Sequence, residues 1–259
     1  MMPSMDAHAD TLFAAEPIAP KRLTDGVLAA LSAAILDGRL PEGGSLPSEA
    51  RLAERFGVSK QVVREAIRSL AGLGVLEVFP GRATRVRTLD AEPLARFWRF
   101  AVGDSRAALA EAVEMRRLIE PPLARLAAAR ANEDDRATLR AAYRRMQDAT
   151  GNAPAWIEAD LDFHEAVARA AHNRLAYLQV RGLRPVVTLV MERFNIRLAR
   201  GPSAWRTALR RHARVLAAIE HSDEDAAQDA MLAHFAAADT AIAELFGPVS
   251  PGRLKGGKS

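Results

Sequence analysis

The chain has 259 residues, of which 49% are hydrophobic and 26% charged, so it is long enough for two globular domains with separate cores. It has no cysteine, which excludes disulfides and thiolate metal ligands, and it shows neither a signal-sequence pattern nor an apolar run of membrane-spanning length. Aromatic residues are scarce at 5% while Ala, Leu and Arg abound, so we expect a cytoplasmic, mainly α-helical protein that does not enter a membrane.

Positive charge is concentrated in one segment of the chain. The formal net charge of the whole chain is +4, but residues 51–87 hold eight basic and three acidic residues, a local balance of +5. The basic residues are Arg51, Arg55, Lys60, Arg64, Arg68, Arg82, Arg85 and Arg87. Such a patch indicates a polyanionic partner.

In chain order, residues 1–20 are expected to be a flexible arm, and residues 21–88 a winged helix-turn-helix domain. A helix over 23–36 ends near Gly38 and is followed by a loop over 40–47. Ser48 is a suitable N-cap for a short helix that ends at Gly57, and Ser59 for the next helix. The apolar period then changes to two, which predicts a hairpin of residues 75–79 and 84–87 with a turn at Pro80-Gly81.

Residues 91–246 show helical periodicity throughout, and we expect a second, all-helical domain there. The predicted helices cover 91–102, 105–130, 134–149, 154–171, 174–199, 203–220 and 223–246. Residues 247–259 are expected to form a disordered tail. The predicted fold class is therefore mainly α, with a small β-hairpin wing.

The second helix of a helix-turn-helix places its N-terminal residues against base edges in the major groove. Lys and Arg donate to guanine, and Gln pairs with adenine. The predicted DNA-binding residues are Ser48, Arg51, Ser59, Lys60, Gln61, Arg64, Arg68 and, at the tip of the wing, Gly81 and Arg82. Double-stranded operator DNA is the expected partner, bound by a homodimer because a palindromic operator matches two-fold symmetry.

Residues 22–88 resemble the GntR superfamily of transcriptional regulators. The matching motifs are Leu46-Pro47-Ser48-Glu49, Leu52-Ala53, Gly57-Val58-Ser59 and Val63-Arg64-Glu65-Ala66. The chain departs from the usual pattern at Lys60, where the family has arginine. It departs again at Ala50, because the arginine that several members carry there is one position later, at Arg51.

Three histidines and one aspartate have the spacing of a metal site. Asp160 and His164 are four residues apart, on the same side of a helix. His212 and His234 flank Asp223, so a helical hairpin that turns at Ser222-Asp223 would bring both imidazoles to the same height. Imidazole and carboxylate ligands suit zinc, nickel, iron or manganese.

The second half of the chain resembles the FCD ligand-binding domain of FadR-type GntR regulators. The matching motifs are Arg116-x-x-Ile119-Glu120, Asp160-Leu161-Asp162-Phe163-His164 with Asn173, and Arg211-His212, Asp223 and Met231-x-x-His234. The resemblance implies that Asp160, His164, His212 and His234 bind a divalent metal, for which we expect zinc. It favours the metal-binding branch over the branch that binds acyl-CoA.

The resemblance also implies that a small organic or sugar acid binds at the metal, with Arg116 and Asn195 as further polar contacts. We therefore expect a ligand-responsive repressor rather than an enzyme. Two alternatives stay open: a regulator that responds to the metal itself, and a metal-dependent hydrolase. The hydrolase is disfavoured because Glu165, beside His164, points about 100° away around the helix.

Overall fold

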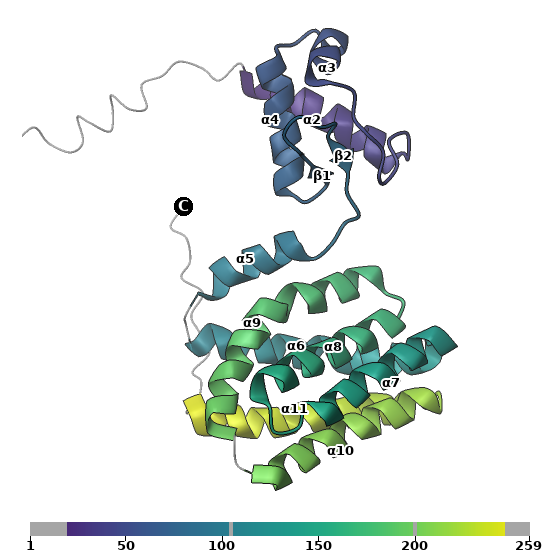
Figure 1. Ribbon diagram of the computed structural model, residues 1–259, viewed down its shortest axis with the longest axis vertical. Helices are drawn as coiled ribbons and strands as arrows, with labels where there is room; N and C mark the ends of the chain where they lie inside the picture. The colour runs from purple at the N-terminus through teal and green to yellow at the C-terminus, as the bar shows by residue number, and fades with distance from the viewer. Residues whose placement is uncertain (1–19, 104–105, 199–200, 247–259) are drawn as a thin grey trace, which may run out of the picture. The chain divides into compact units, whose positions relative to one another are not determined.

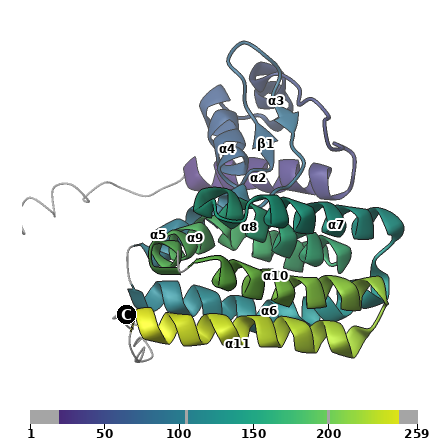
Figure 2. The ribbon, with the colours of Figure 1, turned by 60° about the horizontal axis from the view of Figure 1, so that its bottom comes forward.

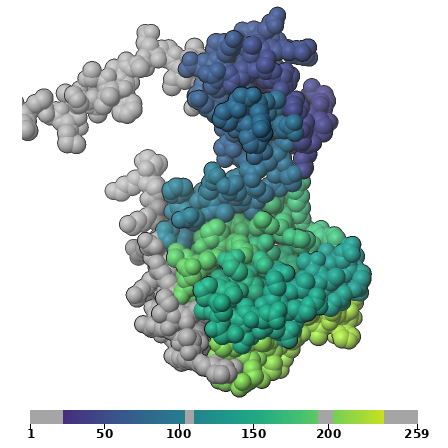
Figure 3. All heavy atoms as spheres, in the orientation of Figure 1, coloured from purple at the N-terminus to yellow at the C-terminus, as the bar shows by residue number. Residues whose placement is uncertain are grey.

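The computed structural model describes the backbone of residues 20–103, 106–198 and 201–246, and the side chains of residues 23–103, 110–192 and 203–236. The chain divides after Asp90 into two compact units. Both are drawn in Figures 1 and 3, the first in purple to blue and the second in teal to yellow. The predicted arm over 1–20, apart from Pro20, and the predicted tail over 247–259 lie outside the described residues.

The first unit consists of three helices and a two-stranded sheet. Its elements are α2 (Pro20–Leu36), α3 (Glu49–Phe56), α4 (Lys60–Gly72), β1 (Leu76–Glu77) and β2 (Arg85–Val86). Apolar side chains that recur at helical spacing form most of its core, which includes Val27, Leu31, Leu52, Val63, Ile67 and Leu70. Leu46 from the loop before α3, Leu76 from β1 and Val86 from β2 complete it. The helix-turn-helix elements α3 and α4 thus bury one face each and leave the other exposed.

The turn between α3 and α4 depends on a glycine. Gly57 adopts a left-handed conformation with φ of +66°, which a side chain would strain. Its backbone N–H closes the end of α3, and the hydroxyl of Ser59 accepts a hydrogen bond from the Val62 N–H at the start of α4. Local sequence therefore fixes both the end of one helix and the start of the next.

The wing is an antiparallel hairpin in which Leu76 pairs with Val86 and Glu77 with Arg85. Its strands have two residues each, shorter than the predicted 75–79 and 84–87. Hydrogen bonding of the hairpin continues beyond these strands, because the Arg87 N–H donates to the Val75 carbonyl. On its other edge β2 pairs with the loop before α3: Ser45 forms a bridge with Arg85, and the Leu46 N–H donates to the Thr84 carbonyl. Some of the backbone groups of the second strand therefore bond to a third segment.

The second unit is entirely helical in its described residues. Its helices are α5 (Glu92–Val102), α6 (Arg106–Arg130), α7 (Glu133–Asp148), α8 (Ala153–Ala170), α9 (Arg174–Leu198), α10 (Gly201–Glu220) and α11 (Glu224–Phe246). Helix α11 packs against both α6 and α10, and Figure 2 shows α6 and α11 running side by side. The predicted fold class, mainly α with a small hairpin, is confirmed.

Helix α8 is the central helix of this unit. It contacts α6, α7 and α9, and 12 of its 18 residues are buried. The core around it contains the fully buried side chains of Phe163, Leu139, Met146, Ile219, Met231 and Phe235. Since α8 carries Asp160 and His164, these polar residues lie inside an apolar core. Among the described residues, none of the helices has the length and apolar composition needed to cross a membrane.

Candidate DNA-binding surface and metal centre

All nine predicted DNA-binding residues are exposed in the first unit. Lys60 and Gln61 lie in the first turn of α4, and Arg64 and Arg68 follow on the same helix at spacings of three and four residues. Such spacing places these side chains toward one side of α4, where they can approach a polyanion together.

Two of the nine residues also have a structural role. The Ser48 hydroxyl accepts from the Arg51 N–H at 3.3 Å, and the Ser59 hydroxyl accepts from the Val62 N–H at the same distance. Both serines are therefore N-caps, which satisfy backbone donors at the starts of α3 and α4. Each hydroxyl keeps its own proton for donation to another acceptor.

Arg64 is held by a carboxylate that the sequence reasoning did not single out. The Arg64 Nε lies 3.1 Å from both carboxylate oxygens of Glu49, and its Nη2 lies 2.6 Å from Oε2. This hydrogen-bonded pairing, opposed in part by desolvation, lowers the pKa of Glu49 below its ordinary value. Glu49 is part of the Leu46-Pro47-Ser48-Glu49 motif found in the sequence. The motif did not indicate that Glu49 pairs with Arg64, which lies on another helix.

The tip of the wing is a tight turn. Gly81 has φ of +71°, and the Arg82 N–H donates to the Phe79 carbonyl at 3.2 Å. The conformation at Gly81 favours glycine because a side chain there would clash with the backbone. Arg82 is exposed directly after this turn.

In the second unit, four predicted metal ligands from three helices come together. Asp160 and His164 lie on α8, His212 on α10 and His234 on α11. The ring centroids of His212 and His234 are 4.4 Å apart, and those of His164 and His234 are 5.0 Å apart. One nitrogen from each histidine lies within 4.8 Å of one nitrogen of each of the others. The predicted α10–α11 hairpin is confirmed: it turns at Ser222 and Asp223, and the Asp223 carboxylate accepts from the Ala226 N–H.

The atoms that face one another in this cluster lack hydrogen-bond partners. His164 Nε2, His212 Nε2 and His234 Nδ1 are buried, and none of them makes a hydrogen bond to the described residues. His212 Nε2 lies 3.0 Å from the Asp160 carboxylate, but without hydrogen-bond geometry. A buried polar atom without a partner is costly, and a metal ion bound by these nitrogens would remove that cost. The donor set therefore fits a divalent metal.

The opposite ring nitrogens of two of these histidines are fixed by neighbours. The His212 Nδ1 donates to the Ala208 carbonyl at 3.0 Å, and the His164 Nδ1 contacts the Glu120 carboxylate. A proton on Nδ1 leaves Nε2 as the nitrogen available for a ligand, and such partners orient metal-binding histidines.

Glu120 is the functional candidate that sequence reasoning missed. It is 1% exposed and lies on α6, where it pairs with Arg116 one turn earlier as well as with His164. The sequence signal was available in the spacing of four residues between Arg116 and Glu120, which places opposite charges side by side on a helix. The partner across the core, His164, could be identified from the fold alone.

The electrostatics of the cluster favour ionised carboxylates and a neutral His234. Burial would raise the pKa of Glu120, but Arg116 and His164 lower it to about 2. Burial would likewise raise the pKa of Asp160, but His212, His164 and His234 keep it below its ordinary range. Burial, together with the neighbouring His212 and His164, holds the pKa of His234 well below 6.5, so its imidazole is neutral. Metal binding needs these protonation states.

The structure describes the side chain of one of the two predicted effector contacts, Arg116, and only the backbone of the other, Asn195. Arg116 is 7% exposed, its guanidinium is bound to Glu120 and it lies 5.3 Å from the centre of the Phe235 ring. It is therefore buried beside the histidine cluster rather than on the surface. Asn195 lies in α9, but its side chain is outside the described residues.

Two family matches cover most of the described chain. Residues 23–86 match the bacterial regulatory proteins of the gntR family, and residues 111–237 match the FCD domain. The first range contains α3, α4 and the wing, and the second contains the histidine cluster.

Several proteins are similar over most of the chain. The galactonate operon transcriptional repressor of Escherichia coli (strain K12) is 30% identical over 229 residues, which are 86% of this chain and 97% of that protein. The Glc operon transcriptional activator of the same strain is 32% identical, over 75% of this chain and 80% of its own length. The solved structure of Streptococcus agalactiae GntR has a TM-score of 0.67 at 26% identity, covering 84% of this chain and 99% of that one.

Proposed function

Because the chain belongs to the GntR family of bacterial regulatory proteins and carries an FCD domain, it is a transcriptional regulator, and we propose that it represses transcription until a small carboxylate or sugar acid binds at a metal in the second unit. Its relatives are transcriptional regulators, so this is not an enzyme family.

The observation that carries the proposal is the set of unpartnered nitrogens on His164, His212 and His234. With the Asp160 carboxylate they form a three-imidazole, one-carboxylate donor set, for which zinc is our first choice and nickel, iron or manganese the alternatives. A divalent ion held there would offer its remaining coordination positions to the carboxylate of an effector. Arg116 and Asn195 are proposed as additional polar contacts of that effector.

The class of effector is proposed from chemistry and from one relative. A carboxylate suits both a cation and a nearby guanidinium, such as that of Arg116. The similar repressor of Escherichia coli controls a galactonate operon, and galactonate is a sugar acid. We therefore expect an aldonate or another hydroxy acid.

The first unit would bind the operator through α4 and the wing. Lys60, Gln61 and Arg64 are exposed near the start of α4, where a recognition helix contacts base edges. Ser59 and Arg68 on α4, Ser48 and Arg51 on α3, and Gly81 and Arg82 in the wing are proposed to contact the phosphate backbone or the adjacent groove. We propose that a homodimer reads a palindromic operator, and that effector binding favours a dimer arrangement with low operator affinity.

The metal-dependent hydrolase receives no support from Glu165. Its carboxylate lies 2.8 Å from Arg184 and 3.5 Å from Arg181, both on α9, and it is therefore directed away from the histidine cluster. A carboxylate engaged in this way is poorly placed as a general base beside the metal.

The chain offers a matched pair of histidines for the test. His212 lies on α10 and His221 directly follows the last residue of that helix. The Nδ1 of each contacts the carbonyl four residues earlier, but only His212 belongs to the buried cluster. Metal content would be measured by mass spectrometry after purification, and thermal unfolding against a panel of aldonates and hydroxy acids. We expect His212→Ala to lose the metal and the ligand response, and His221→Ala to keep both.

A fully metallated His212→Ala variant would refute the assigned site. If no acid of the panel raises the melting temperature of metal-loaded protein, operator affinity should be followed during chelation and refilling. Affinity that tracks metal occupancy would replace the acid sensor by a regulator that responds to the metal itself.

A further inference from the structure

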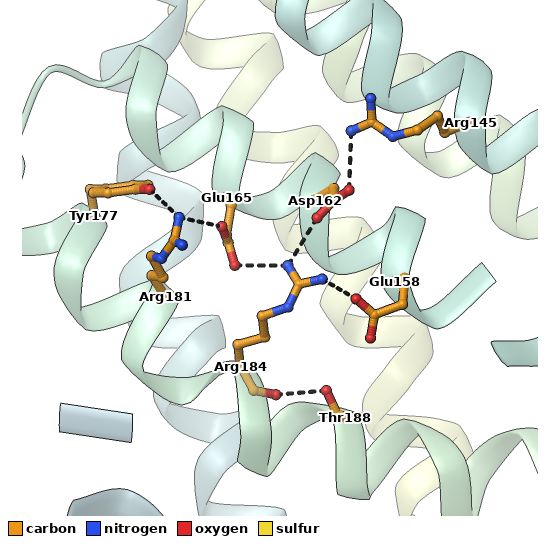
Figure 4. A network of polar contacts seen from close by, with 8 residues as sticks. All are labelled: Arg145, Glu158, Asp162, Glu165, Tyr177, Arg181, Arg184 and Thr188. Atoms are coloured by element: carbon orange, nitrogen blue, oxygen red, sulfur yellow. Dashed lines mark hydrogen bonds and ion pairs between the residues drawn. The ribbon is translucent and has the colours of Figure 1, made fainter. Parts of the chain in front are cut away.

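A second polar site lies on the face of α8 that is turned away from Asp160 and His164. Helices α7, α8 and α9 line a cavity of about 440 Å3 there. Its charged lining residues are Arg145, Asp162, Glu165, Arg169, Arg181 and Arg184, most of which appear in Figure 4. The 100° step of an α-helix places Asp162, Glu165 and Arg169 roughly opposite to the two metal-site residues of α8.

The two carboxylates of the cavity are each shared between two arginines. Asp162 lies 3.1 Å from Arg145 and 2.9 Å from Arg184, and Glu165 lies 2.8 Å from Arg184 and 3.5 Å from Arg181. With Arg169, which belongs to the lining but to neither of these pairs, four guanidinium groups and two acids line the cavity, a formal balance of +2. The acid Glu158 adds a contact to Arg184 at the margin.

Arg169 contributes a positive charge that none of the described acids neutralises. In the part of the chain that the structure describes, no carboxylate lies within ion-pair distance of it, and its guanidinium lies 5.6 Å from the centre of the Tyr177 ring. Each guanidinium has five N–H donors, far more than the shared carboxylates can accept. The cavity therefore has both charge and hydrogen-bond donors in excess.

These properties select the kind of ligand. A volume of about 440 Å3 is within the range of small-molecule sites, and Ala166 is the single apolar residue among the described lining residues, which disfavours an apolar ligand. A phosphate monoester carries a charge of about −1.5 to −2 at pH 7 and three acceptor oxygens, which match the balance of +2 and the planar donor pairs of arginine.

We propose that this cavity, called here the arginine pocket, binds a small phosphate-bearing anion. Arg145, Arg169 and Arg181 bind its oxygens, and Arg184 keeps Asp162 and Glu165 in place. Occupancy draws guanidinium groups away from carboxylates on the same helix that carries Asp160 and His164. The arginine pocket is thus a second ligand site of the second unit. Its influence on operator affinity rests on the function proposed above, whereas ligand binding to the pocket does not.

The test uses the full chain and inorganic phosphate, titrated by isothermal calorimetry. Arg169→Ala removes an exposed side chain of the pocket, and Arg144→Ala removes an exposed neighbour of Arg145 that does not line it. We expect binding to wild type and Arg144→Ala, and at least about tenfold weaker binding to Arg169→Ala, because that variant lacks a charged hydrogen-bond donor of the pocket. Circular dichroism checks that helix content is unchanged, and Arg169→Gln repeats the test with a polar side chain.

The His212→Ala variant separates this site from the metal. Phosphate binding that persists in His212→Ala and weakens in Arg169→Ala supports the arginine pocket, whatever the fate of the metal proposal. Three results would overturn it: no binding to wild type at millimolar phosphate, equal binding to Arg169→Ala, or binding lost in His212→Ala. Citrate binding as tightly as phosphate would overturn the preference for phosphate.

Discussion

At the scale of single residues, the metal cluster depends on a buried chain of contacts that begins on α6. Arg116 pairs with Glu120, and Glu120 pairs with the Nδ1 of His164. The imidazole is thereby oriented with Nε2 toward His212 and His234. Since these contacts join two helices, Glu120 acts on the proposed metal through His164 as a positioning residue.

We expect Glu120→Gln to weaken metal affinity by about 10- to 100-fold, because loss of an outer partner of a metal-binding histidine has effects of that size. Competition with a chromogenic chelator measures the affinity. The matched control is Glu114→Gln, on the same helix, whose side chain is 61% exposed and 3.9 Å from Arg117. Equal affinities in the two variants would argue against the positioning role.

The pairing of Arg64 with Glu49 leads to a second residue-scale prediction. Arg64→Ala should weaken operator binding by about 1–3 kcal/mol, the range of a specific arginine–base contact. Glu49→Gln should instead reduce discrimination between operator and random DNA, because it releases the guanidinium from its orientation and removes a negative charge. Fluorescence anisotropy with both DNAs measures the two effects. If Glu49→Gln keeps full discrimination, the carboxylate does not orient Arg64.

At the scale of elements, α4 begins where Ser59 caps it, and α8 presents two different polar faces. The core face of α8 carries Asp160 and His164, and its other polar face carries Asp162 and Glu165, which bind arginines of α7 and α9. A helix buried on so many sides needs its charged residues paired, because an unpaired buried charge is strongly destabilising. Side chains of α6 and α10 contact the core face, and arginines of α7 and α9 contact the other polar face.

The cap of α4 can be tested against a second serine on the same helix. Ser59→Ala should lower the free energy of unfolding by about 1 kcal/mol, the usual effect of losing an N-cap. Ser69 donates to the carbonyl of Glu65 inside the helix and caps nothing, so Ser69→Ala should change stability by less than about 0.5 kcal/mol. Urea denaturation compares them, and equal losses would contradict the capping role.

At the scale of the whole molecule, the proposed metal and the proposed DNA surface belong to different compact units, which divide after Asp90. The histidine cluster lies within the second unit, and its residues come from three helices of that unit. Metal binding can therefore stabilise the second unit directly, and affects operator affinity only through coupling between the units.

Removal of the metal should lower the melting temperature of the second unit and leave that of the first unaltered. Metal at a free concentration of 100 times its dissociation constant adds about 2.7 kcal/mol to the free energy of unfolding, and this contribution is lost when the metal is removed. Differential scanning calorimetry with and without a chelator measures the melting temperature of each unit. In His212→Ala the second unit should melt at the lower temperature under both conditions. A uniform shift of all transitions would mean that the two units unfold as one.

The helices and their ends could be predicted from the sequence. The second-unit helices α5 to α11 begin and end within about two residues of the predicted ranges, because apolar periodicity and capping residues act over one or two turns. Local spacing also predicted that Asp160 would neighbour His164, and that a hairpin at Asp223 would bring His212 to His234. The family motifs added the assignment to GntR regulators with an FCD domain, which the comparisons confirm.

Contacts between side chains from distant segments could be identified only in the folded structure. The pairs Glu49–Arg64 and Glu120–His164, the third partner of the wing at Ser45, and the arginine pocket each join elements whose distance depends on how helices pack. A periodic pattern states which face of a helix is buried, but not which neighbour covers it, because many packing partners bury the same apolar area equally well. Charged and polar contacts across the core need one specific arrangement, and that arrangement is a property of the folded chain.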